Sequence, residues 1–554
     1  MNLLSKYRHA ILVAAFLFIF IAQACSIADK KSNTWDEPAH IMSGYAYATE
    51  GMDYLSPLNH PVFGRLLTGI LPAALTELDF NKAVKPEGST GSDFFPYSVK
   101  FLYENKTSGD TVLFLARLPN IILGAILGIY VFIWSKELWG IKGAYLSLFF
   151  YTLSPNILAH TSLATTDMPA TAFFFISAYY LYKLSNNLRP ANALAVSVAL
   201  ALAFTSKHTA MLLLPLFAFA LIAGIKKDGI KAVPHYLSII LLTYIFIWGI
   251  YGFRYHSASP YYQPLMWDKF ASSSFMPFFD KLRALKILPE AYLYSIAGVL
   301  MGVADGKSAF LMGQYSNAGW WYYFIIAFLI KTPIPTIVFF IASVLYSIVE
   351  KETLKKSLIL IIPASIIFTV FSLQKVNIGL RHILPAYPFL FTLIGFVPSI
   401  KTQSIKMARA VFYGGIVWYA YSAALIYPNQ LAYFNELIGG PKNGYKYLAD
   451  SNIDWGQDLK SLKIFMDEHQ IESIKLAYFG CSDPKYFGIN YEYLPSFMIP
   501  EPQNAKDEIP LKGWFAISAT MLDGVYLTDK DFYAPFRQIK PYGNVGYSIY
   551  IYRF

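Results

Sequence analysis

Long apolar runs separated by short polar connections repeat along the first 427 residues of the chain. A helix that crosses the hydrocarbon core of a bilayer needs about 20 mostly apolar residues, and it tolerates Gly and Pro. The runs therefore predict an α-helical polytopic membrane protein with about eleven spans. These lie near residues 10–28, 112–134, 143–158, 168–184, 191–206, 208–224, 236–253, 320–347, 357–373, 382–398 and 409–427.

The first run has a second interpretation. Lys6 and Arg8 precede it, and Ala22-Gln23-Ala24 resembles a signal-peptidase site. The apolar core of a signal peptide is shorter than a span, at about 7–15 residues. The length of this run therefore favours an uncleaved first helix.

The basic residues fall mainly on one side of these spans. Cytoplasmic loops carry an excess of Lys and Arg, so we expect a cytoplasmic N-terminus. This orientation places outside the first long loop (about 29–111), a second loop (about 254–319) and the tail after Tyr427. The inner connections hold Lys136, Lys142, Lys183, Arg189, Lys226, Lys227, Lys231, Lys351, Lys355, Lys356, Lys401, Lys406 and Arg409, and the outer short ones hold Lys207, Lys375 and Arg381.

Two segments of the first outer loop alternate apolar and small residues with a helical period. They run from Trp35 to about Thr49 and from His60 to about Leu75, and Pro61 suits the first turn of a helix. We expect amphipathic helices that lie at the interface rather than span. Together they would present to one outward-facing cavity Asp36, Glu37, His40, His60 and Arg65.

The tail, residues 428–554, shifts to the composition of a soluble domain. Its pattern predicts a helix from Gly456 to His469, followed by strands at Ile474–Phe479, Trp514–Ala519 and Val545–Tyr552. The chain is thus expected to divide into a transmembrane catalytic part, residues 1–427, and a small extracytoplasmic α/β domain, residues 428–554.

The composition supports a membrane protein. Charged residues make up 14% of the chain and hydrophobic residues 55%, whereas soluble domains average about 25% charged. The net charge of +10 lies in short clusters between apolar runs, which are topology signals and do not indicate nucleic acid. Cys25 and Cys481 lie far apart and give neither a disulfide framework nor a metal-binding spacing.

Asp36, Glu37 and His40 form the most informative cluster. Ionisable groups beside a bilayer are candidates for function because hydrocarbon penalises unpaired charge. An ionised carboxylate here could take a proton from an acceptor hydroxyl, as a general base does. The alternative is that the carboxylates only cap the helix that they open.

Other charged residues fall on the same outer side. Asp167 begins a span, where a helix cap would also explain it, and Lys207 ends an apolar stretch, where snorkelling would suffice. Outward cations around outward carboxylates suit a substrate with a phosphate leaving group, because the cations would stabilise the charge that builds on it. The remaining candidates on this side are Arg254, Arg381 and His382.

Cofactors are weakly indicated. The chain has no Gly-rich phosphate-binding loop, so ATP use is not expected. Glu37 and His40 are three residues apart and could ligate a divalent metal together, but no further His or Cys stands at a confirming spacing.

These residues resemble the GT-C membrane glycosyltransferases, specifically the protein O-mannosyltransferase and aminoarabinose-transferase-like group. The resemblance covers roughly the first 400 residues. Its most specific part is Asp36-Glu37 followed by His60-Pro61. Supporting motifs are Thr166-Asp167-Met168-Pro169, Ser206-Lys207 and Arg381-His382 with Leu384-Pro385 and Tyr387-Pro388.

The resemblance implies an inverting transfer of one sugar from a polyprenyl phosphate carrier to an acceptor hydroxyl on a protein, lipid or glycan at the outer face of the plasma membrane. Asp36 matches the catalytic acidic residue of the family, with Glu37 beside it. Lys207, Arg254 and Arg381 are the candidate phosphate contacts.

The sequence also departs from the family pattern. Val62 stands where a second proline is common, and Asn59 stands where the aminoarabinose-type enzymes carry a glutamate metal ligand. A zinc site like theirs is therefore not implied. The tail run from Leu448 to Asp458 looks like one found in a bacterial and archaeal branch, and it carries no assigned role here.

Two other functions compete with this one. A transporter or lipid flippase would also have many spans and few charges, although transporters place charges near the bilayer midplane between broken, repeated helices. A transferase of whole oligosaccharides would need a larger outer groove.

Overall fold

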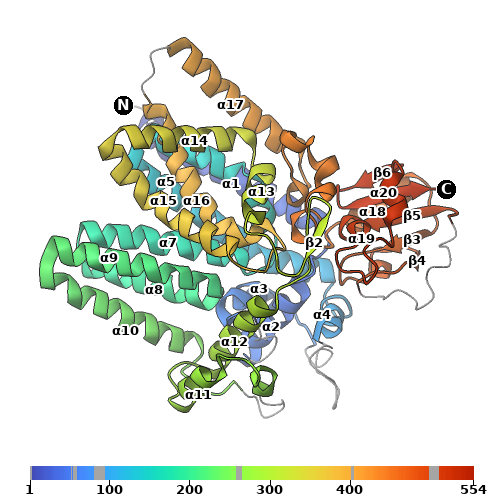
Figure 1. Ribbon diagram of the computed structural model, residues 1–554, viewed down its shortest axis with the longest axis horizontal. Helices are drawn as coiled ribbons and strands as arrows, with labels where there is room; N and C mark the ends of the chain where they lie inside the picture. Colours follow the sequence, from blue (N-terminus) through green and yellow to red (C-terminus); the bar gives the residue numbers. More distant parts are fainter. Residues whose placement is uncertain are drawn as a thin grey trace.

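The structure is a computed structural model that describes residues 3–51, 53, 59–79, 94–257, 265–400, 405–497 and 511–554. Helices dominate it, with a sheet near the C-terminus (Figure 1). The helices before residue 257 are α1 (Leu3–Lys30), α2 (Glu37–Glu50), α3 (Val62–Leu75), α4 (Phe94–Tyr103), α5 (Gly109–Thr152), α6 (Pro155–Thr161), α7 (Asp167–Asn186), α8 (Pro190–Ser206), α9 (Leu213–Asp228) and α10 (Val233–Ile250).

The second half of the membrane part continues with helices and a short hairpin. Its elements are α11 (Met276–Ala284), α12 (Glu290–Asp305), β1 (Ala309–Leu311), β2 (Gln314–Ser316), α13 (Tyr323–Lys331), α14 (Ile334–Val349), α15 (Lys351–Ser372), the 3-10 helix η6 (Leu380–Ala386), α16 (Tyr387–Ile394) and α17 (Ile405–Leu425).

Among the described residues, five helical stretches are long and apolar enough to cross a membrane, or six if the bent pair α13 and α14 forms one span. Each of the expected runs is largely helical. The runs at 112–134 and 143–158 lie on either side of Gly140, where α5 breaks with a left-handed φ of 78°, and the second run continues into α6. The run at 191–206 forms the shorter α8. The expected helical fold class is confirmed.

The two helices expected in the first loop are present as α2 and α3, although the consecutive residues Glu37–Ala46 of α2 are all buried rather than one face alone. They cross at Gly44 and Gly69, where a Cβ atom on either residue would overlap the backbone of the other helix. Pro61 precedes α3 with an extended backbone. This close crossing holds the N-terminal ends of the first-loop helices in one place, which matters because Asp36 lies at that end of α2.

The tail forms a five-stranded sheet in the order β4-β3-β5-β7-β6. Strand β3 pairs in parallel with β4 and β5, and β7 pairs antiparallel with β5 and β6. Helix α18 buries Leu459, Leu462 and Met466 against the sheet. The elements are α18 (Leu459–Glu468), β3 (Ile474–Ala477), β4 (Tyr491–Tyr493), β5 (Trp514–Ser518), α19 (Ala519–Asp523), α20 (Ala534–Gln538), β6 (Gly543–Val545) and β7 (Ile549–Arg553).

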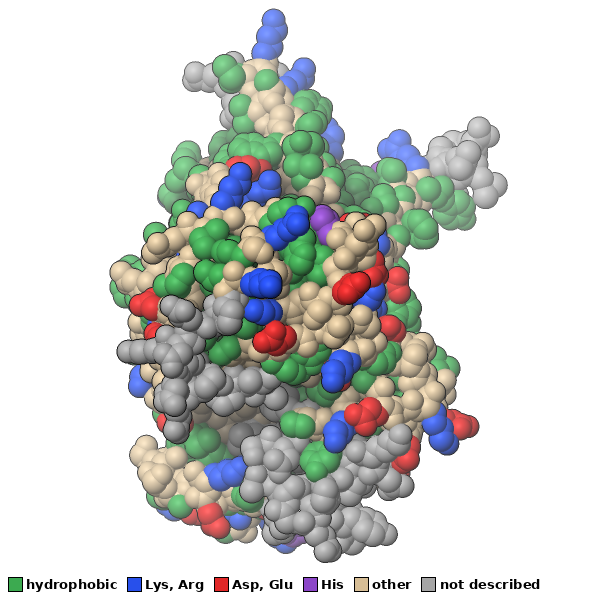
Figure 2. All heavy atoms as spheres, turned by 90° about the vertical axis from the view of Figure 1, so that its right-hand side faces the viewer, with side chains coloured by type: hydrophobic (Ala, Val, Ile, Leu, Met, Phe, Trp, Pro, Cys, Tyr) green, Lys and Arg blue, Asp and Glu red, His purple; other side chains and the backbone are tan. Residues whose placement is uncertain are grey.

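The predicted tail elements therefore match, and the predicted α/β character of this region is confirmed. Figure 2 shows charged side chains of both signs intermingled over the face formed by the tail, whereas hydrophobic side chains cover the helices that protrude at the top of the view. The difference is expected if only the helices face lipid.

The tail docks directly on the residues that follow α1. Lys31 forms a buried ion pair with Asp458, with the Lys31 Nζ 2.5 Å from Oδ1. Two backbone bonds run alongside it, from Ser32 N to the Gln457 oxygen at 3.0 Å and from Trp35 N to the Trp455 oxygen at 2.9 Å. The tail is thus bound to the chain immediately before Asp36.

Candidate active site

Asp36 and Arg381 form an ion pair across 345 positions of sequence. One terminal nitrogen of Arg381 lies 2.9 Å from Asp36 Oδ2. Asp36 immediately precedes α2, and Arg381 is the second residue of η6. The Asp36 side chain is 24% exposed and that of Arg381 is 10% exposed. The pair is therefore shielded, but its carboxylate stays accessible.

A second acid–cation pair adjoins the first. The same Arg381 nitrogen lies 3.8 Å from Asp167 Oδ2, and Lys207 Nζ lies 2.5 Å from Asp167 Oδ1. Asp167 begins α7, and Lys207 follows the last residue of α8. Charged groups from distant parts of the chain thus form one row: Asp36, Arg381, Asp167, Lys207.

The environment of Asp36 favours its ionised form. Burial raises the pKa of this carboxyl, but the positive charge of Arg381 and the nearby His40 and Lys307 outweigh burial and hold the pKa below its ordinary value. At neutral pH, Asp36 is a carboxylate that can accept a proton.

Glu37 is arranged differently from its neighbour. Its two oxygens each accept a 2.7 Å bond from Arg117, and both side chains are fully buried. They also accept bonds from the backbone nitrogens of Ala164 and Thr34, each at 2.7 Å. Arg117 in turn donates to backbone oxygens at the end of α1, including that of Ser32 at 2.9 Å. Glu37 therefore fixes α1, α2 and α5 to one another.

His40 lies beside Asp36, and a second histidine, His60, lies against His40. The rings of His40 and His60 meet edge to face, with their centroids 4.8 Å apart, and His60 Nδ1 lies 3.3 Å from Thr166 Oγ1. Burial lowers the pKa of His40 to about 4 and that of His60 well below its ordinary value. Both rings are neutral at physiological pH, so they offer hydrogen bonds rather than charge.

The structure does not bring every candidate to this row. Arg254 donates to the backbone oxygen of Gly51 at the far end of α2, roughly 20 Å along the helix from Asp36. Arg65 is buried on α3, where its Nε donates to the Pro61 oxygen at 3.3 Å. His382 is half-buried against Phe324 and Phe371, and it lies beside the row, since the charges of Lys207, Arg381 and Asp167 act on it.

A metal site finds little support. Within the described ranges, no group of three or more His, Cys, Asp or Glu side chains is placed to hold a metal ion. Glu37 of the considered Glu37–His40 pair is already saturated by Arg117 and backbone N–H donors. The acceptor oxygens that a metal would need are engaged.

Sequence reasoning missed two buried cations. Arg117 lies in the apolar run 112–134, and Lys331 lies in the run 320–347. Lys331 Nζ donates to the backbone oxygens of Leu431 and Tyr433, each at 3.0 Å, and to that of Asn452. A basic residue inside a span was the available signal, because such a charge must find partners.

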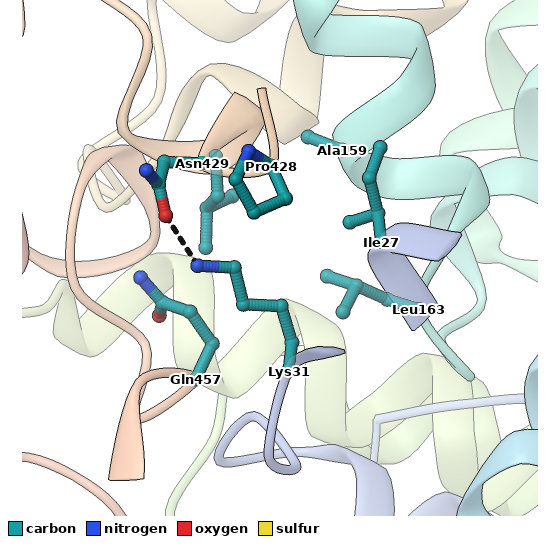
Figure 3. Close-up of a pocket in the computed structure, with 8 residues that line it drawn as sticks. Ile27, Lys31, Ala159, Leu163, Pro428, Asn429 and Gln457 are labelled. Carbon is teal, nitrogen blue, oxygen red and sulfur yellow. Dashed lines mark hydrogen bonds between the residues drawn. The ribbon is translucent and has the colours of Figure 1, made fainter. Parts of the chain in front are cut away.

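A small cavity lies beside the end of α1 and is lined in part by Lys31, Asn429 and Gln457 (Figure 3). Lys31 Nζ donates to Asn429 Oδ1 at 2.5 Å. The cavity measures about 20 Å³, which suffices for one water molecule and not for a sugar.

The comparison with known families supplies the wider context. Residues 106–251 match the family described as dolichyl-phosphate-mannose-protein mannosyltransferase. That segment contains Asp167 and Lys207 of the charged row, together with Arg117. The expected resemblance to the GT-C membrane glycosyltransferases is confirmed. With its apolar helices, this GT-C-like chain is an integral membrane protein.

Solved structures of GT-C-like proteins are also similar. ArnT from Cupriavidus metallidurans bound to undecaprenyl phosphate is 12% identical, with a TM-score of 0.48 over 98% of this chain and 97% of that one. The archaeal oligosaccharyltransferase AglB from Archaeoglobus fulgidus, in complex with an inhibitory peptide and a dolichol-phosphate, is 11% identical, with a TM-score of 0.44 over 95% of this chain and 72% of that one. Likenesses at this level carry no argument about chemistry. No curated protein matches the sequence.

Proposed function

We propose that this protein transfers a single sugar from a polyprenyl phosphate carrier, undecaprenyl or dolichyl, to an acceptor hydroxyl with inversion at the sugar carbon. The supporting observation is the row Asp36, Arg381, Asp167 and Lys207, which combines an accessible carboxylate with two cations. A protein, lipid or glycan is the acceptor.

Asp36 acts as the general base. The acceptor oxygen attacks the sugar carbon while its proton passes to Asp36, and the bond from that carbon to the phosphate oxygen breaks with its electron pair remaining on the phosphate. The lowered pKa supports this role, because the carboxylate is ionised before the acceptor arrives.

Arg381 and Lys207 stabilise the departing phosphate. Negative charge develops on the leaving oxygen in the transition state, and pre-positioned cations interact with it most strongly there. Among the described residues, the buried Nε of Arg381 has no hydrogen-bond partner, so the guanidinium keeps an unsatisfied donor within the row. Asp167 holds both cations in register.

Glu37 positions the base and takes no proton itself. It is fully buried and bonded to Arg117, and it therefore fixes the backbone one residue from Asp36. His40 and His60 line the acceptor side as neutral hydrogen-bonding groups. Arg254, at the far end of α2, and Arg65, buried on α3, support the loops around the row, and His382 packs beside Arg381.

The location and division of the chain are part of the proposal. The bias of Lys and Arg toward one set of loops supports a plasma-membrane protein with a cytoplasmic N-terminus and with the charged row outside. The change in composition after residue 427 supports a catalytic part at 1–427 and an extracytoplasmic domain at 428–554.

The bent pair α13 and α14 is the feature that a transporter would share, since broken spans carry transporter binding sites. Here, however, Lys331 at the break is engaged by the backbone oxygens of Leu431, Tyr433 and Asn452, all in the tail. A structural role therefore accounts for this charge, and sugar transfer is the better supported function.

The test is transfer by the purified full-length chain from radiolabelled polyprenyl-phosphate hexoses and pentoses to membrane extracts of a strain that lacks it. Asp36→Asn should lower turnover by about 10²–10⁴-fold, the usual contribution of a general base, with donor binding retained. Asp467→Asn is the control, since Asp467 pairs only with the nearby Lys463 on α18. Full turnover by Asp36→Asn would exclude Asp36 as the base.

A further inference from the structure

The tail contributes a side chain to the charged row. The Arg381 guanidinium carbon lies 4.1 Å from the centre of the Trp455 ring, and Trp455 is buried. A guanidinium stacked on an indole gains a cation–π attraction and keeps its N–H groups free at the edge, in the plane of the stack. The indole ring therefore covers one face of the Arg381 guanidinium, and the edge of the guanidinium points to the carboxylates.

The segment around Trp455, residues 450–458, binds both partners of the Asp36–Arg381 pair. The Trp455 backbone oxygen accepts from Trp35 N at 2.9 Å, next to Asp36. Asn452 Oδ1 accepts from Leu380 N at 3.0 Å, next to Arg381. One short segment thus fixes the backbone beside the base and the backbone beside the cation.

Asp450 adds charge to the same contact. It is buried with a left-handed φ of 57°, and its carboxylate accepts from the Tyr526 hydroxyl and from Ser451 N. Its negative charge acts on Arg381 together with those of Asp36 and Asp167.

We propose that Trp455 and Asp450 are positioning residues of the reaction, which orient Arg381 so that it can serve Asp36 and the departing phosphate at once. The tail is then a part of the active site and not an independent appendage. This inference rests on the proposed glycosyl transfer and adds residues of the tail to it.

The competing explanation is that Trp455 only fills the core between the tail and the membrane part. Both explanations predict a loss of stability when the ring is removed. They differ in the turnover of the protein that does fold. A ring that only fills the core can be replaced without lowering turnover per folded molecule, whereas a positioning ring can be replaced only by another aromatic ring.

The experiment compares Trp455→Leu and Trp455→Phe in the purified full-length chain, with Trp514→Leu as a matched control. Trp514 also stacks on an arginine, Arg553, with the guanidinium 5.0 Å from its ring, but it lies on β5 away from the row. Turnover, donor KM and melting temperature are measured for each variant, with Asp36→Asn assayed alongside.

We expect Trp455→Leu to lower kcat by about tenfold with donor KM changed less, and Trp455→Phe to stay within about threefold of the wild type, as the strength of a shielded cation–π contact implies. Trp514→Leu should keep its turnover. Asp450→Asn, a change that preserves shape, is the second variant if Trp455→Leu does not fold, and it should lower kcat by about threefold or more, since a charge partner of Arg381 is lost.

Wild-type turnover in both Trp455→Leu and Asp450→Asn would overturn the inference. So would an equal loss in Trp514→Leu, or a Trp455→Phe variant as slow as Trp455→Leu. If Asp36→Asn retains turnover, the proposed function fails instead, and the two failures are distinguished within one set of assays.

Discussion

Two acid–arginine pairs, built from adjacent residues, behave in opposite ways. Asp36 meets Arg381 at 2.9 Å with its side chain 24% exposed, whereas Glu37 meets Arg117 at 2.7 Å with both side chains fully buried. Glu37 also accepts backbone bonds that fill its remaining lone pairs. The same residue types, one position apart, thus give an accessible base and a closed structural joint, and the difference lies in burial and saturation.

The largest effect is expected from removing Arg117, the cation of the buried pair. Arg117→Leu leaves the Glu37 carboxylate buried without its partner, and breaking a buried pair on one side costs about 3–5 kcal/mol. We expect a large drop in melting temperature, or no folded protein in detergent extracts. The double variant with Glu37→Leu, which removes both charges, should recover part of the loss. An unchanged melting temperature in Arg117→Leu would contradict the assigned role.

The role of Lys207 can be separated from that of the base. Lys207→Met keeps most of the length of the side chain but removes the charge that lies 2.5 Å from Asp167. We expect donor KM to rise by about tenfold or more, as for the loss of one charged contact to phosphate, with a smaller change in acceptor KM. Lys463→Met, at a half-exposed position of α18, is the control. Equal effects on donor and acceptor would indicate a structural cation.

The pH profile of activity tests whether Arg381 lowers the pKa of Asp36. The base must be ionised, so activity falls as pH drops through the pKa of Asp36, which Arg381 holds below its ordinary value. Arg381→Gln removes that charge and its hydrogen bond to Asp36, and leaves the smaller effects of His40 and Lys307. The acid limb of kcat/KM should move to higher pH, on top of a lower plateau. A limb that does not move would show that Arg381 does not act on the base.

Much of the fold followed from sequence periodicity. The helices of the first loop were expected at Trp35–Thr49 and His60–Leu75 and occur as α2 and α3, because a helical period of 3.6 residues is a local property. The tail strands β3, β5 and β7 were recognisable because strand patterns are local as well, whereas the three-residue strands β4 and β6 were not predicted. The boundary between the runs at 112–134 and 143–158 agrees with the break at Gly140 inside α5.

The site was predictable only in part. The distribution of basic residues predicts the topology, and the topology predicts that Asp36, Asp167, Lys207 and Arg381 share one side of the membrane. The separate fate of Glu37 depends on Arg117, which is 80 positions away, and no local pattern encodes that pairing. The role of the tail was missed likewise, since the stacking of Trp455 on Arg381 is a contact between distant segments.

The central claim is that Asp36 serves the chemistry and Glu37 serves the fold. The most direct measurement is turnover and melting temperature for Asp36→Asn and Glu37→Gln, purified and assayed side by side. The account predicts that Asp36→Asn melts like the wild type but transfers almost no sugar, while Glu37→Gln melts at a lower temperature. Undiminished sugar transfer by Asp36→Asn, or a Glu37→Gln variant that is fully stable yet inactive, would contradict it.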